Sequence, residues 1–446
     1  MKQSNNITIP EPRYFESLYP ADTLKDELSK VVSFITKGAS CQVLGLPGVG
    51  KSRLLRLLAY NRSVRELHLG TDQAKSHFIY MDFSEIKGRP LTDATKFILI
   101  SLIYSLSERG MIEESNQINS SLKEALEFND ELILFQALKK SIDYLTLEKE
   151  IRIVFLIDRL ESYSQDITEQ FFNNLKVLRN RAKYQFACIF ALTRPLDMTV
   201  DRNVLAEFYE HVVGNTVFIQ LAGPDEKDFR LDYIEKVTNK KDSDTRKEIL
   251  ILTGGHGKLA KISYEAVLSE SKTPENLSEF LLGHRQVRGA LSELWKYFTP
   301  QEQATLKNTS RAEDETVQFL THIGILNDGK ISIPLFTTFI ASIKEEKEVF
   351  SFDEDRNEIY KGTINLTDVL TPSEFRLLKH LIINVGRICG KEEIITAVWR
   401  DTATFEGVTD QALDQIVYRL RKKVETDPNS PQYIQTIKGK GVKLSE

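Results

Sequence analysis

The sequence predicts an α/β fold with a parallel sheet in the N-terminal part of the chain and a small α+β fold at the C-terminal end. Three observations carry this prediction. A glycine-rich segment, GLPGVGKS at 45–52, stands between a short apolar strand and an apolar helix. An apolar run at 151–157 ends in Asp158, as expected of a strand that is buried on both faces. An amphipathic helix at 410–424 precedes a hairpin at 433–444 with cationic residues at its tip.

The glycine-rich segment matches the phosphate-binding P-loop, G-x-x-x-x-G-K-[ST]. Gly48 and Gly50 allow backbone N–H groups to turn inward around an anion. Lys51 is expected to reach the β- and γ-phosphates, and the Ser52 hydroxyl to bind Mg²⁺. The expected ligand is therefore ATP or ADP with Mg²⁺, and the flanking strand and helix disfavour the alternative of a chance glycine-rich turn. The other loop residues in the expected contact set are Gly45, Pro47, Val49 and Arg53.

The edge of the sheet where parallel strands end is the place for the remaining catalytic groups. Strands are expected at 41–44, 77–82, 151–158, 186–192 and 216–221. Asp158 is the candidate Mg²⁺ ligand, directly or through water, and Glu161 is the candidate for polarising the attacking water. A strand-end cap and a solvated acid are the respective alternatives. Arg159 follows Asp158 where an Asp-Glu pair would favour fast hydrolysis, so we expect at most a slow ATPase.

A γ-phosphate sensor is expected at the end of the strand 186–192. Arg194 is the first candidate and Thr193 the second, and an exposed loop arginine is the alternative reading. Helices are expected at 225–240 and 243–252, and a third begins at the segment Gly254-Gly255-His256-Gly257-Lys258. These helices predict a small helical lid after the sheet.

Residues 12–270 resemble a STAND-type ATPase, a regulatory branch related to AAA+ proteins. The resemblance is carried by GLPGVGKS (45–52), FLIDRLES (155–162), ALTRP (191–195), LAGP (221–224) and LTGGHGKL (252–259). It implies that Pro224 contacts the adenine and that His256 and Lys258 are further nucleotide-contact candidates. It also makes Arg179 and Arg181 candidates for an arginine that acts in a neighbouring subunit.

The same resemblance implies a mainly helical winged-helix domain at 283–345 that presses on the nucleotide in the resting state. Several helices and a short β-wing are expected there. His322 follows an apolar helix, and a structural histidine is the favoured reading. Control of this domain by nucleotide is an implication of the family and not of the spacing.

The C-terminal segment reads as a separate α+β domain after a charge-rich linker at 343–348. A small antiparallel sheet is expected at 349–368, and Thr371, Pro372 and Glu374 predict a capped helix start. On the helix 410–424 one face is apolar and the opposite face is polar. The candidate base-reading residues on the polar face are Gln411, Gln415, Arg419 and Lys422, and the candidate phosphate contacts that flank it are Tyr418, Arg421 and Lys423.

Residues 349–446 closely resemble the OmpR/PhoB-type winged helix of response regulators. LTPSEFRLLKHL, the run Tyr-Arg-Leu-Arg-Lys-Lys and YIQTIKGKGVKL carry the match, with Val442 where an aromatic residue is usual. The resemblance implies that the third helix enters the major groove and that Lys440 and Lys443 of the wing contact the minor groove. A winged helix used only for protein contacts is the alternative.

Composition agrees with a soluble regulator. The net charge of the 446 residues is −5, but residues 415–446 hold seven Lys/Arg against three acids, which indicates a local nucleic-acid surface. No apolar run approaches the roughly 20 residues needed to span a bilayer, so we expect a cytoplasmic protein without membrane contact. Cys41, Cys188 and Cys389 show no zinc or disulfide spacing and are expected to be ordinary buried thiols.

Together these observations predict an α/β P-loop NTPase with a helical lid, a mainly helical winged-helix domain and a C-terminal α+β winged helix-turn-helix, at 1–225, 226–282, 283–345 and 349–446. The predicted function is ATP-dependent transcriptional regulation, with nucleotide controlling oligomerisation or exposure of the C-terminal domain. Expected partners are double-stranded DNA and further copies of the chain, and RNA polymerase or a protein inducer are additional candidates. A defence or mobile-element ATPase and an initiator-like ATPase that loads a partner on DNA remain alternatives.

Overall fold

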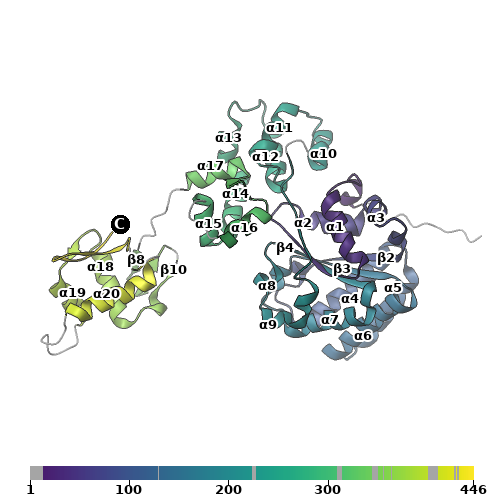
Figure 1. Ribbon diagram of the computed structural model, residues 1–446, viewed down its shortest axis with the longest axis horizontal. Helices are drawn as coiled ribbons and strands as arrows, with labels where there is room; N and C mark the ends of the chain where they lie inside the picture. Colours follow the sequence, from purple (N-terminus) through teal and green to yellow (C-terminus); the bar gives the residue numbers. More distant parts are fainter. Residues whose placement is uncertain are drawn as a thin grey trace, which may run out of the picture. The chain divides into compact units, whose positions relative to one another are not determined.

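A five-stranded parallel sheet organises the N-terminal unit (Figure 1). The strands run in the order β2-β3-β4-β1-β5. Their bounds are β1 (Cys41–Leu44), β2 (Ser76–Asp82), β3 (Arg152–Asp158), β4 (Phe186–Leu192) and β5 (Thr216–Phe218). Every residue of β1 and β4 is buried, because helices cover both faces of the sheet. The order places the P-loop strand β1 between β4 and β5, and β4 between β1 and β3.

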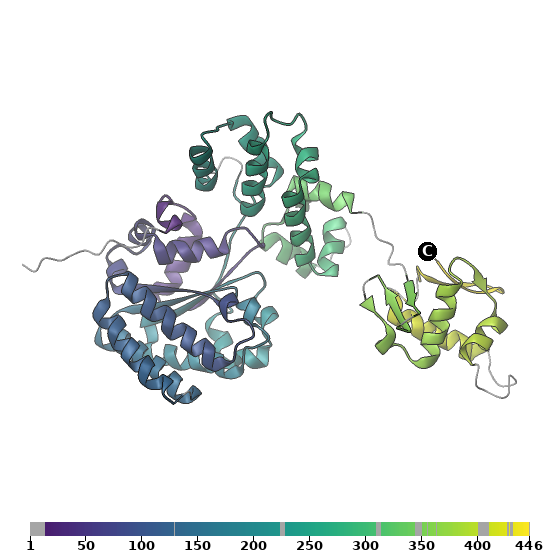
Figure 2. The same ribbon diagram turned by 180° about the vertical axis from the view of Figure 1, so that it is seen from behind.

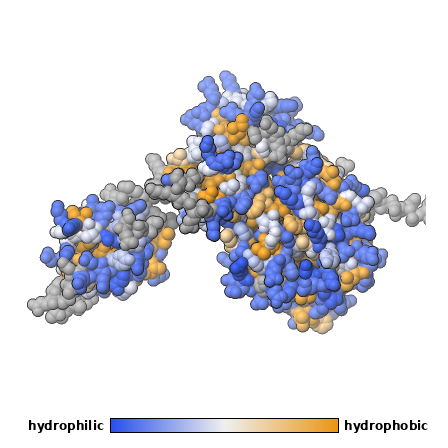
Figure 3. Space-filling model, viewed as in Figure 1, coloured by the Kyte–Doolittle hydropathy of each residue, from blue (hydrophilic) through white to orange (hydrophobic). Residues whose placement is uncertain are grey.

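The computed structural model describes residues 14–128, 130–223, 228–308, 314–343, 350–354, 356–362, 364–399, 410–425, 428 and 431–445. The chain divides into two units, Met1–Ser342 and Ile343–Glu446. The first three predicted domains therefore lie in one unit. Among the described residues no helix has the length and apolar character of a membrane span. Hydrophilic residues cover most of the visible face of the molecule (Figure 3).

Helices lie on both sides of the sheet, with α1 and α3 on the side opposite α4 to α7 (Figures 1 and 2). Three helices, α4, α5 and α6, lie between β2 and β3. Gly110, at φ 73°, follows the end of α4, and the Asp130 side chain accepts from Ile133 N at the start of α6. The helices of this layer are α1 (Lys25–Thr36), α2 (Lys51–Tyr60), α3 (Arg62–Leu69), α4 (Leu91–Glu108), α5 (Ile112–Leu126), α6 (Glu131–Asp143), α7 (Glu169–Ala182), α8 (Leu196–Thr199) and α9 (Arg202–Leu205).

Strand β5 ends three residues earlier than the sequence predicts. Ile219 N still donates to Leu44 O at 2.8 Å, so the ladder reaches one residue past Phe218. The Gln220 side chain then donates to the backbone of His322 in the following helical region. Contacts with that region replace strand pairing at this point.

The rest of the N-terminal unit is mainly helical, as the sequence predicts. The lid region contains α10 (Phe229–Thr238), α11 (Ser243–Leu252), α12 (Gly257–Ser269) and α13 (Leu277–Gly283). The middle region contains α14 (Arg285–Tyr297), α15 (Pro300–Lys307), α16 (Asp314–His322), the short hairpin β6 (Leu326–Asn327) and β7 (Lys330–Ile331), and α17 (Pro334–Ser342). This hairpin is the β-wing expected after a helical segment.

The C-terminal unit is a winged helix with a small antiparallel sheet in front of it. The sheet strands are β8 (Phe350–Asp353), β9 (Glu358–Lys361) and β10 (Ile364–Asn365). The elements that follow are α18 (Pro372–Ile383), β11 (Ile388–Cys389), α19 (Lys391–Val398), α20 (Asp410–Val424), β12 (Ile434–Ile437) and β13 (Gly441–Leu444). Residues 344–348 of the expected linker lie outside the described residues.

The core of this unit confirms the apolar face predicted for α20. Leu413, Ile416, Val417, Leu420 and Val424 are all buried. The predicted cap of α18 is also present: Thr371 N donates to Glu374 Oε2 at 2.9 Å, and the Thr371 hydroxyl accepts from Glu374 N at 3.4 Å. Because the apolar residues of α20 pack into the core, its opposite, polar face points away from the core.

Candidate nucleotide site and DNA-reading surface

The P-loop has the backbone conformation that its glycines allow. Gly48 and Gly50 have φ angles of 81° and 126°, which residues with a Cβ rarely adopt. Helix α2 begins immediately after the loop, at Lys51. The Lys51 ammonium turns back into the loop and donates to the carbonyls of Gly45 (2.8 Å) and Leu46 (2.9 Å). A buried cation thus lies at the centre of a helix N-terminus, where anions bind.

The charge on Lys51 is sensitive to its surroundings. Burial lowers the pKa of Lys51 from its usual value to about 8, and the nearby carboxylates of Glu161 and Asp158 oppose that shift. The electrostatic influence of these two acids places them near the P-loop. The predicted Mg²⁺ and water-activating groups therefore gather around Lys51.

Asp158 lies at the end of β3 and is 2% exposed. Its carboxylate accepts from the Tyr80 hydroxyl at 2.7 Å and from Arg159 N at 3.0 Å. The Arg159 guanidinium instead forms an ion pair with Asp82, at 3.3 Å. Tyr80 was not singled out by the sequence, because the contact depends on the neighbouring position of β2 and β3. Its pKa is raised by burial and by the Asp158 charge.

Glu161 is held by the end of the adjacent strand. Its Oε1 accepts from both the backbone N–H and the hydroxyl of Thr193, the latter at 3.0 Å. Of the two sensor candidates after β4, Thr193 is therefore the one that contacts Glu161. The structure does not bring Arg194 to Glu161.

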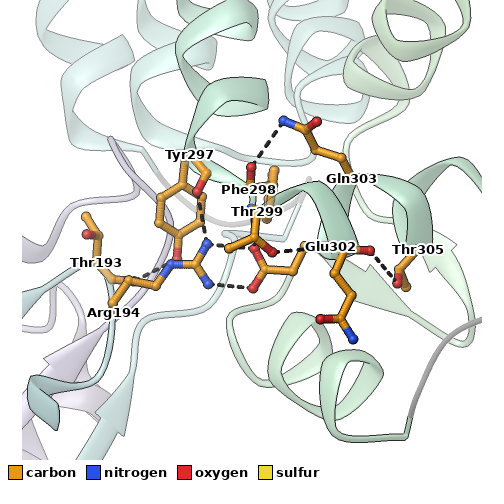
Figure 4. A network of polar contacts seen from close by, with 9 residues as sticks. Thr193, Arg194, Tyr297, Phe298, Thr299, Glu302, Gln303 and Thr305 are labelled. Carbon is orange, nitrogen blue, oxygen red and sulfur yellow. Dashed lines mark hydrogen bonds and ion pairs between the residues drawn. The ribbon is translucent and has the colours of Figure 1, made fainter. Parts of the chain in front are cut away.

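Arg194 points toward the middle region (Figure 4). Its guanidinium forms two bonds to the Glu302 carboxylate, at 2.5 and 2.7 Å, and donates to Tyr297 O at 2.9 Å. It also lies 4.2 Å from the centre of the Tyr297 ring and 5.0 Å from that of Phe319. The alternative of an exposed loop arginine is wrong, because the Arg194 side chain is 18% exposed, whereas its role as a phosphate sensor stays a prediction. The residue connects the sheet edge to the start of α15.

The lid lies directly on the P-loop. His256 Nδ1 accepts from Leu259 N at 3.3 Å, so its Nε2 carries the proton and donates to Pro47 O at 2.8 Å. Burial lowers the pKa of His256 to about 4, which keeps the ring neutral. Lys258 N donates to Gly48 O at 3.0 Å, while its ammonium pairs with Glu293 of α14. Both residues that were candidates for nucleotide contact therefore touch the loop itself.

Arg53, the last residue of the expected contact set, is buried beside the loop. Its guanidinium lies 3.0 Å from the position that a Cβ on Gly50 would occupy. The pKa of Arg53 is lowered by burial and by the neighbouring Arg230, and a hydrogen bond to Tyr19 opposes this. Neither Tyr19 nor Arg230 was predicted from the sequence to lie at this site. Both come from segments distant in sequence that fold around the loop.

Of three further candidates, one lies outside the described residues and two contact side chains away from the loop. Pro224, the expected adenine contact, lies outside the described residues. Arg181 forms an ion pair with Asp143 at 2.6 Å, and Arg179 donates to Asn180 at 3.4 Å. A role of either arginine in a neighbouring subunit stays a prediction. The His322 ring stacks on Phe218 with centres 5.2 Å apart, which fits the structural role expected for it.

The predicted DNA contacts of α20 separate into two groups. Gln411, Gln415, Tyr418, Arg419 and Lys422 are exposed, and the Lys422 ammonium lies 4.9 Å from the centre of the Tyr418 ring. Arg421 instead donates to Ile434 O (2.9 Å) and the Thr436 hydroxyl (2.7 Å), which attaches the helix to the wing. Lys423 donates to Val369 O (2.8 Å) and pairs with the buried Glu374. Arg421 and Lys423 are therefore already bonded to other groups of the C-terminal unit. Their position in a basic run of the sequence did not reveal these bonds.

The wing carries the other two predicted contacts. Lys440 is exposed in the turn between β12 and β13, and Lys443 is half-buried in β13. The wing is anchored by Glu425, a buried carboxylate that the sequence analysis missed. It accepts from the backbone N–H groups of Gln432, Tyr433 and Ile434, at 2.9, 3.0 and 2.7 Å. In the sequence, the one feature that points to Glu425 is its position as an acid at the end of a basic helix.

Comparisons with known proteins identify the C-terminal unit. Residues 368–444 match the family model described as "Transcriptional regulatory protein, C terminal". Protein PetR of Rhodobacter capsulatus is 34% identical over 96 residues, which cover 21% of this chain and 40% of PetR. The DNA-binding domain of Klebsiella pneumoniae RstA, solved in complex with the RstA box, is 23% identical, with a TM-score of 0.19 over 22% of this chain and 91% of that one. The C-terminal unit is an OmpR/PhoB-type winged helix.

The N-terminal unit has more distant structural neighbours. The Walker-type ATPase PABY2304 of Pyrococcus abyssi is 14% identical, with a TM-score of 0.44 over 75% of this chain and 99% of that one. The P-loop NTPase fold is shown by the parallel sheet and the loop described above. The STAND subgroup indicated by the sequence motifs stays a prediction.

Proposed function

We propose that this chain is a nucleotide-switched DNA-binding transcriptional regulator. ATP or ADP with Mg²⁺ binds at the P-loop, and its state controls oligomerisation or exposure of the C-terminal winged helix. The observation that carries the proposal is a continuous chain of contacts from Glu161 through Thr193 and Arg194 to Glu302. These contacts connect Glu161 to Glu302 of the middle region through the adjacent residues Thr193 and Arg194.

The residues around the loop fit a magnesium nucleotide. Lys51 supplies a cation, and the backbone of 45–52 supplies N–H groups at a helix N-terminus. The Ser52 hydroxyl and the Asp158 carboxylate are hard oxygen donors of the kind that Mg²⁺ prefers. Bound Mg²⁺ would neutralise charge on the phosphates, and Glu161, oriented by Thr193, would accept a hydrogen bond from the attacking water.

The switch rests on competition for Arg194. A guanidinium binds carboxylate and phosphate in the same two-pronged geometry, so Glu302 and the γ-phosphate of ATP are alternative partners for it. In this structure Glu302 holds it. A ligand that offers Arg194 a phosphate would weaken the attachment of α15 and shift the population toward a released middle region.

A second contact supports coupling between nucleotide and the middle region. His322, at the end of α16, stacks on Phe218 at the end of β5, and its carbonyl accepts from Gln220 at 2.8 Å. Strands β4 and β5 both end at the ligand-binding edge of the sheet. The middle region therefore covers that edge from two strands on either side of the P-loop strand.

The output of the switch is DNA binding by α20. Its exposed glutamines and Arg419 are of the residue types that read base edges in the major groove, and the exposed Lys440 is the wing residue proposed to contact the minor groove. The matched domain is found in transcriptional regulatory proteins. Regulation of transcription is therefore the function that both units support best.

The test compares genome-wide DNA occupancy of the wild-type chain and of Lys51→Ala at equal expression. Discrete promoter peaks that are lost or altered in the variant support nucleotide-gated regulation. A site taken from those peaks then allows DNA affinity to be measured with ADP and with a non-hydrolysable ATP analogue at one salt concentration. Equal affinity and equal oligomeric state in the two nucleotide states would refute the switch, and an absence of discrete peaks would refute the regulator.

A further inference from the structure

Three potential metal ligands converge in the C-terminal unit. They are His380 on α18, Cys389 in β11 and Glu393 on α19, and their nearest donor atoms all lie within 4.8 Å of one another. The His380 Nε2 is 3.1 Å from Glu393 Oε1. Helices α18 and α19 pack against each other and β11 connects them (Figure 1). The cluster therefore sits where three consecutive elements meet.

The donor set and its spacing suit a small divalent cation of intermediate softness. Zinc binds Cys sulfur at about 2.3 Å and His nitrogen or carboxylate oxygen at about 2.0–2.2 Å, in tetrahedral geometry. Two donors of such a site are separated by roughly 3.3–3.7 Å. The 3.1 Å His380–Glu393 pair is already inside that separation, and the sulfur, within 4.8 Å of the other donors, needs to approach by about 1.5 Å at most. Side-chain rotation within existing packing supplies a movement of that size.

We propose that His380, Cys389 and Glu393 form a binding site for Zn²⁺ or a chemically similar divalent transition metal. The three side chains supply one nitrogen, one sulfur and one oxygen, and water completes a tetrahedral set. On binding, the S–H bond of Cys389 breaks, a sulfur–metal bond forms and the proton leaves to solvent. No change of oxidation state is involved.

The surroundings of the thiol support a ligand role. Cys389 is fully buried, and among the described residues no hydrogen-bond partner of its sulfur is found. The second carboxylate oxygen of Glu393 holds the side chain in place, because Oε2 accepts a hydrogen bond from Gly390 N at 3.4 Å. An anchored carboxylate beside a histidine is the arrangement that keeps metal ligands in position.

Arg387 is a cation that contacts the cluster. It pairs with Glu393 Oε1, the oxygen that also contacts His380, and it donates to Asn384 Oδ1 at 2.8 Å. Arg387 thus competes with a metal for the carboxylate. The wild-type site is therefore expected to bind metal more weakly than the same site without this arginine. Replacement of Arg387 should raise the metal affinity, whereas replacement of a ligand should lower it.

The site would act on the wing. Cys389 pairs with Val442 of β13, and a Cβ on Gly441 would lie 1.9 Å from the Cys389 carbonyl oxygen. A metal that joins Cys389 to α18 and α19 therefore stiffens the strand that anchors the wing hairpin. Metal binding is expected to raise the melting temperature of the C-terminal unit and to favour the ordered wing.

The experiment is a titration of the full chain, free of nucleotide and Mg²⁺, with Co²⁺ as a spectroscopic probe. The wild type is expected to develop a sulfur-to-cobalt charge-transfer band at one equivalent, and Zn²⁺ should displace it. Cys389→Ala should lose the band. Cys188→Ala, which removes an equally buried thiol in the sheet of the other unit, should keep it.

Two further variants keep the test decisive if Cys389→Ala does not fold. His380→Gln retains a hydrogen-bonding group but removes the ligand, and its Co²⁺ affinity should fall at least about tenfold. Arg387→Gln should raise the affinity severalfold. A wild-type chain without the band overturns the proposal, as does a band that persists in folded Cys389→Ala or is unchanged in His380→Gln.

Discussion

Replacement of Glu302 by glutamine tests how the sheet edge holds the middle region. Both carboxylate oxygens of Glu302 bind Arg194, and Oε2 also accepts from Thr299 N at 2.8 Å in the cap of α15. Glutamine serves in the same capping position, and its oxygen still accepts one bond from the guanidinium. Glu302→Gln therefore removes the charge while leaving the shape and the cap in place.

The magnitude follows from the burial of the pair. Loss of one partner of a fully buried ion pair costs about 3–5 kcal/mol. The Arg194 and Glu302 side chains are 18% and 9% exposed, so water compensates part of that loss. We expect a cost of about 2–3 kcal/mol, which shifts the equilibrium between attached and released middle regions roughly 30- to 150-fold.

Native-state hydrogen exchange of the full chain with saturating ADP measures this shift. Glu302→Gln should increase exchange throughout α14, α15 and α16. Thr299→Ala is the matched control, because it removes the cap hydroxyl of the same helix, at a cost of about 1 kcal/mol, and spares the ion pair. Its effect should stay in the first turn of α15.

The reasoning would be refuted by identical exchange patterns in Glu302→Gln and Thr299→Ala. A double-mutant cycle with Arg194→Gln gives an independent check. A coupling energy below about 0.5 kcal/mol between Arg194 and Glu302 would show that the pair does not hold the two regions together.

The remaining predictions concern nucleotide affinity, DNA affinity and the wing. Phosphate binding should raise the pKa of Lys51 from about 8, so ADP binding should take up a proton. The affinity for ADP is full below pH 8, where Lys51 is protonated, and should fall about tenfold between pH 7 and 9. Calorimetry in two buffers of different ionisation enthalpy measures both the proton uptake and the loss of affinity. Arg419→Ala should weaken specific DNA binding by about 1–3 kcal/mol at unchanged stability, as measured by anisotropy titrations. Arg421→Ala should mainly lower the free energy of unfolding, by about 1–3 kcal/mol, as measured by urea unfolding. Gly441→Ala, at φ 138° and against a neighbouring carbonyl, should cost more than about 3 kcal/mol and abolish the C-terminal melting transition.

Local chemistry explains which site residues could be read from the sequence. The P-loop requires particular residue types at fixed spacing, so its glycines and Lys51 are recognisable without a structure. The same holds for Asp158, because an apolar run that ends in an acid places the acid at the sheet edge. The apolar face of α20 follows from its helical period, and all five of its apolar residues are buried.

The partners of these residues could not be read in the same way. The sequence shows Arg194 after a strand, but its engagement by Glu302 depends on the docking of α15 more than 100 positions later. The run Arg419 to Lys423 reads as uniformly basic, yet the fold occupies Arg421 and Lys423 with carbonyls and a buried acid. Side-chain partners across elements are set by packing, which a one-dimensional pattern does not contain.

By itself the sequence determined the classes of element and the chemistry of the P-loop, because helical period, strand burial and phosphate binding all depend on neighbours within a few residues. The tertiary structure decided which charges are paired and which side chains are available. It attached the lid to the loop through His256, turned Arg194 toward the middle region, and brought His380, Cys389 and Glu393 together. These contacts join residues from separate elements, and their geometry arises only when the cores close around them.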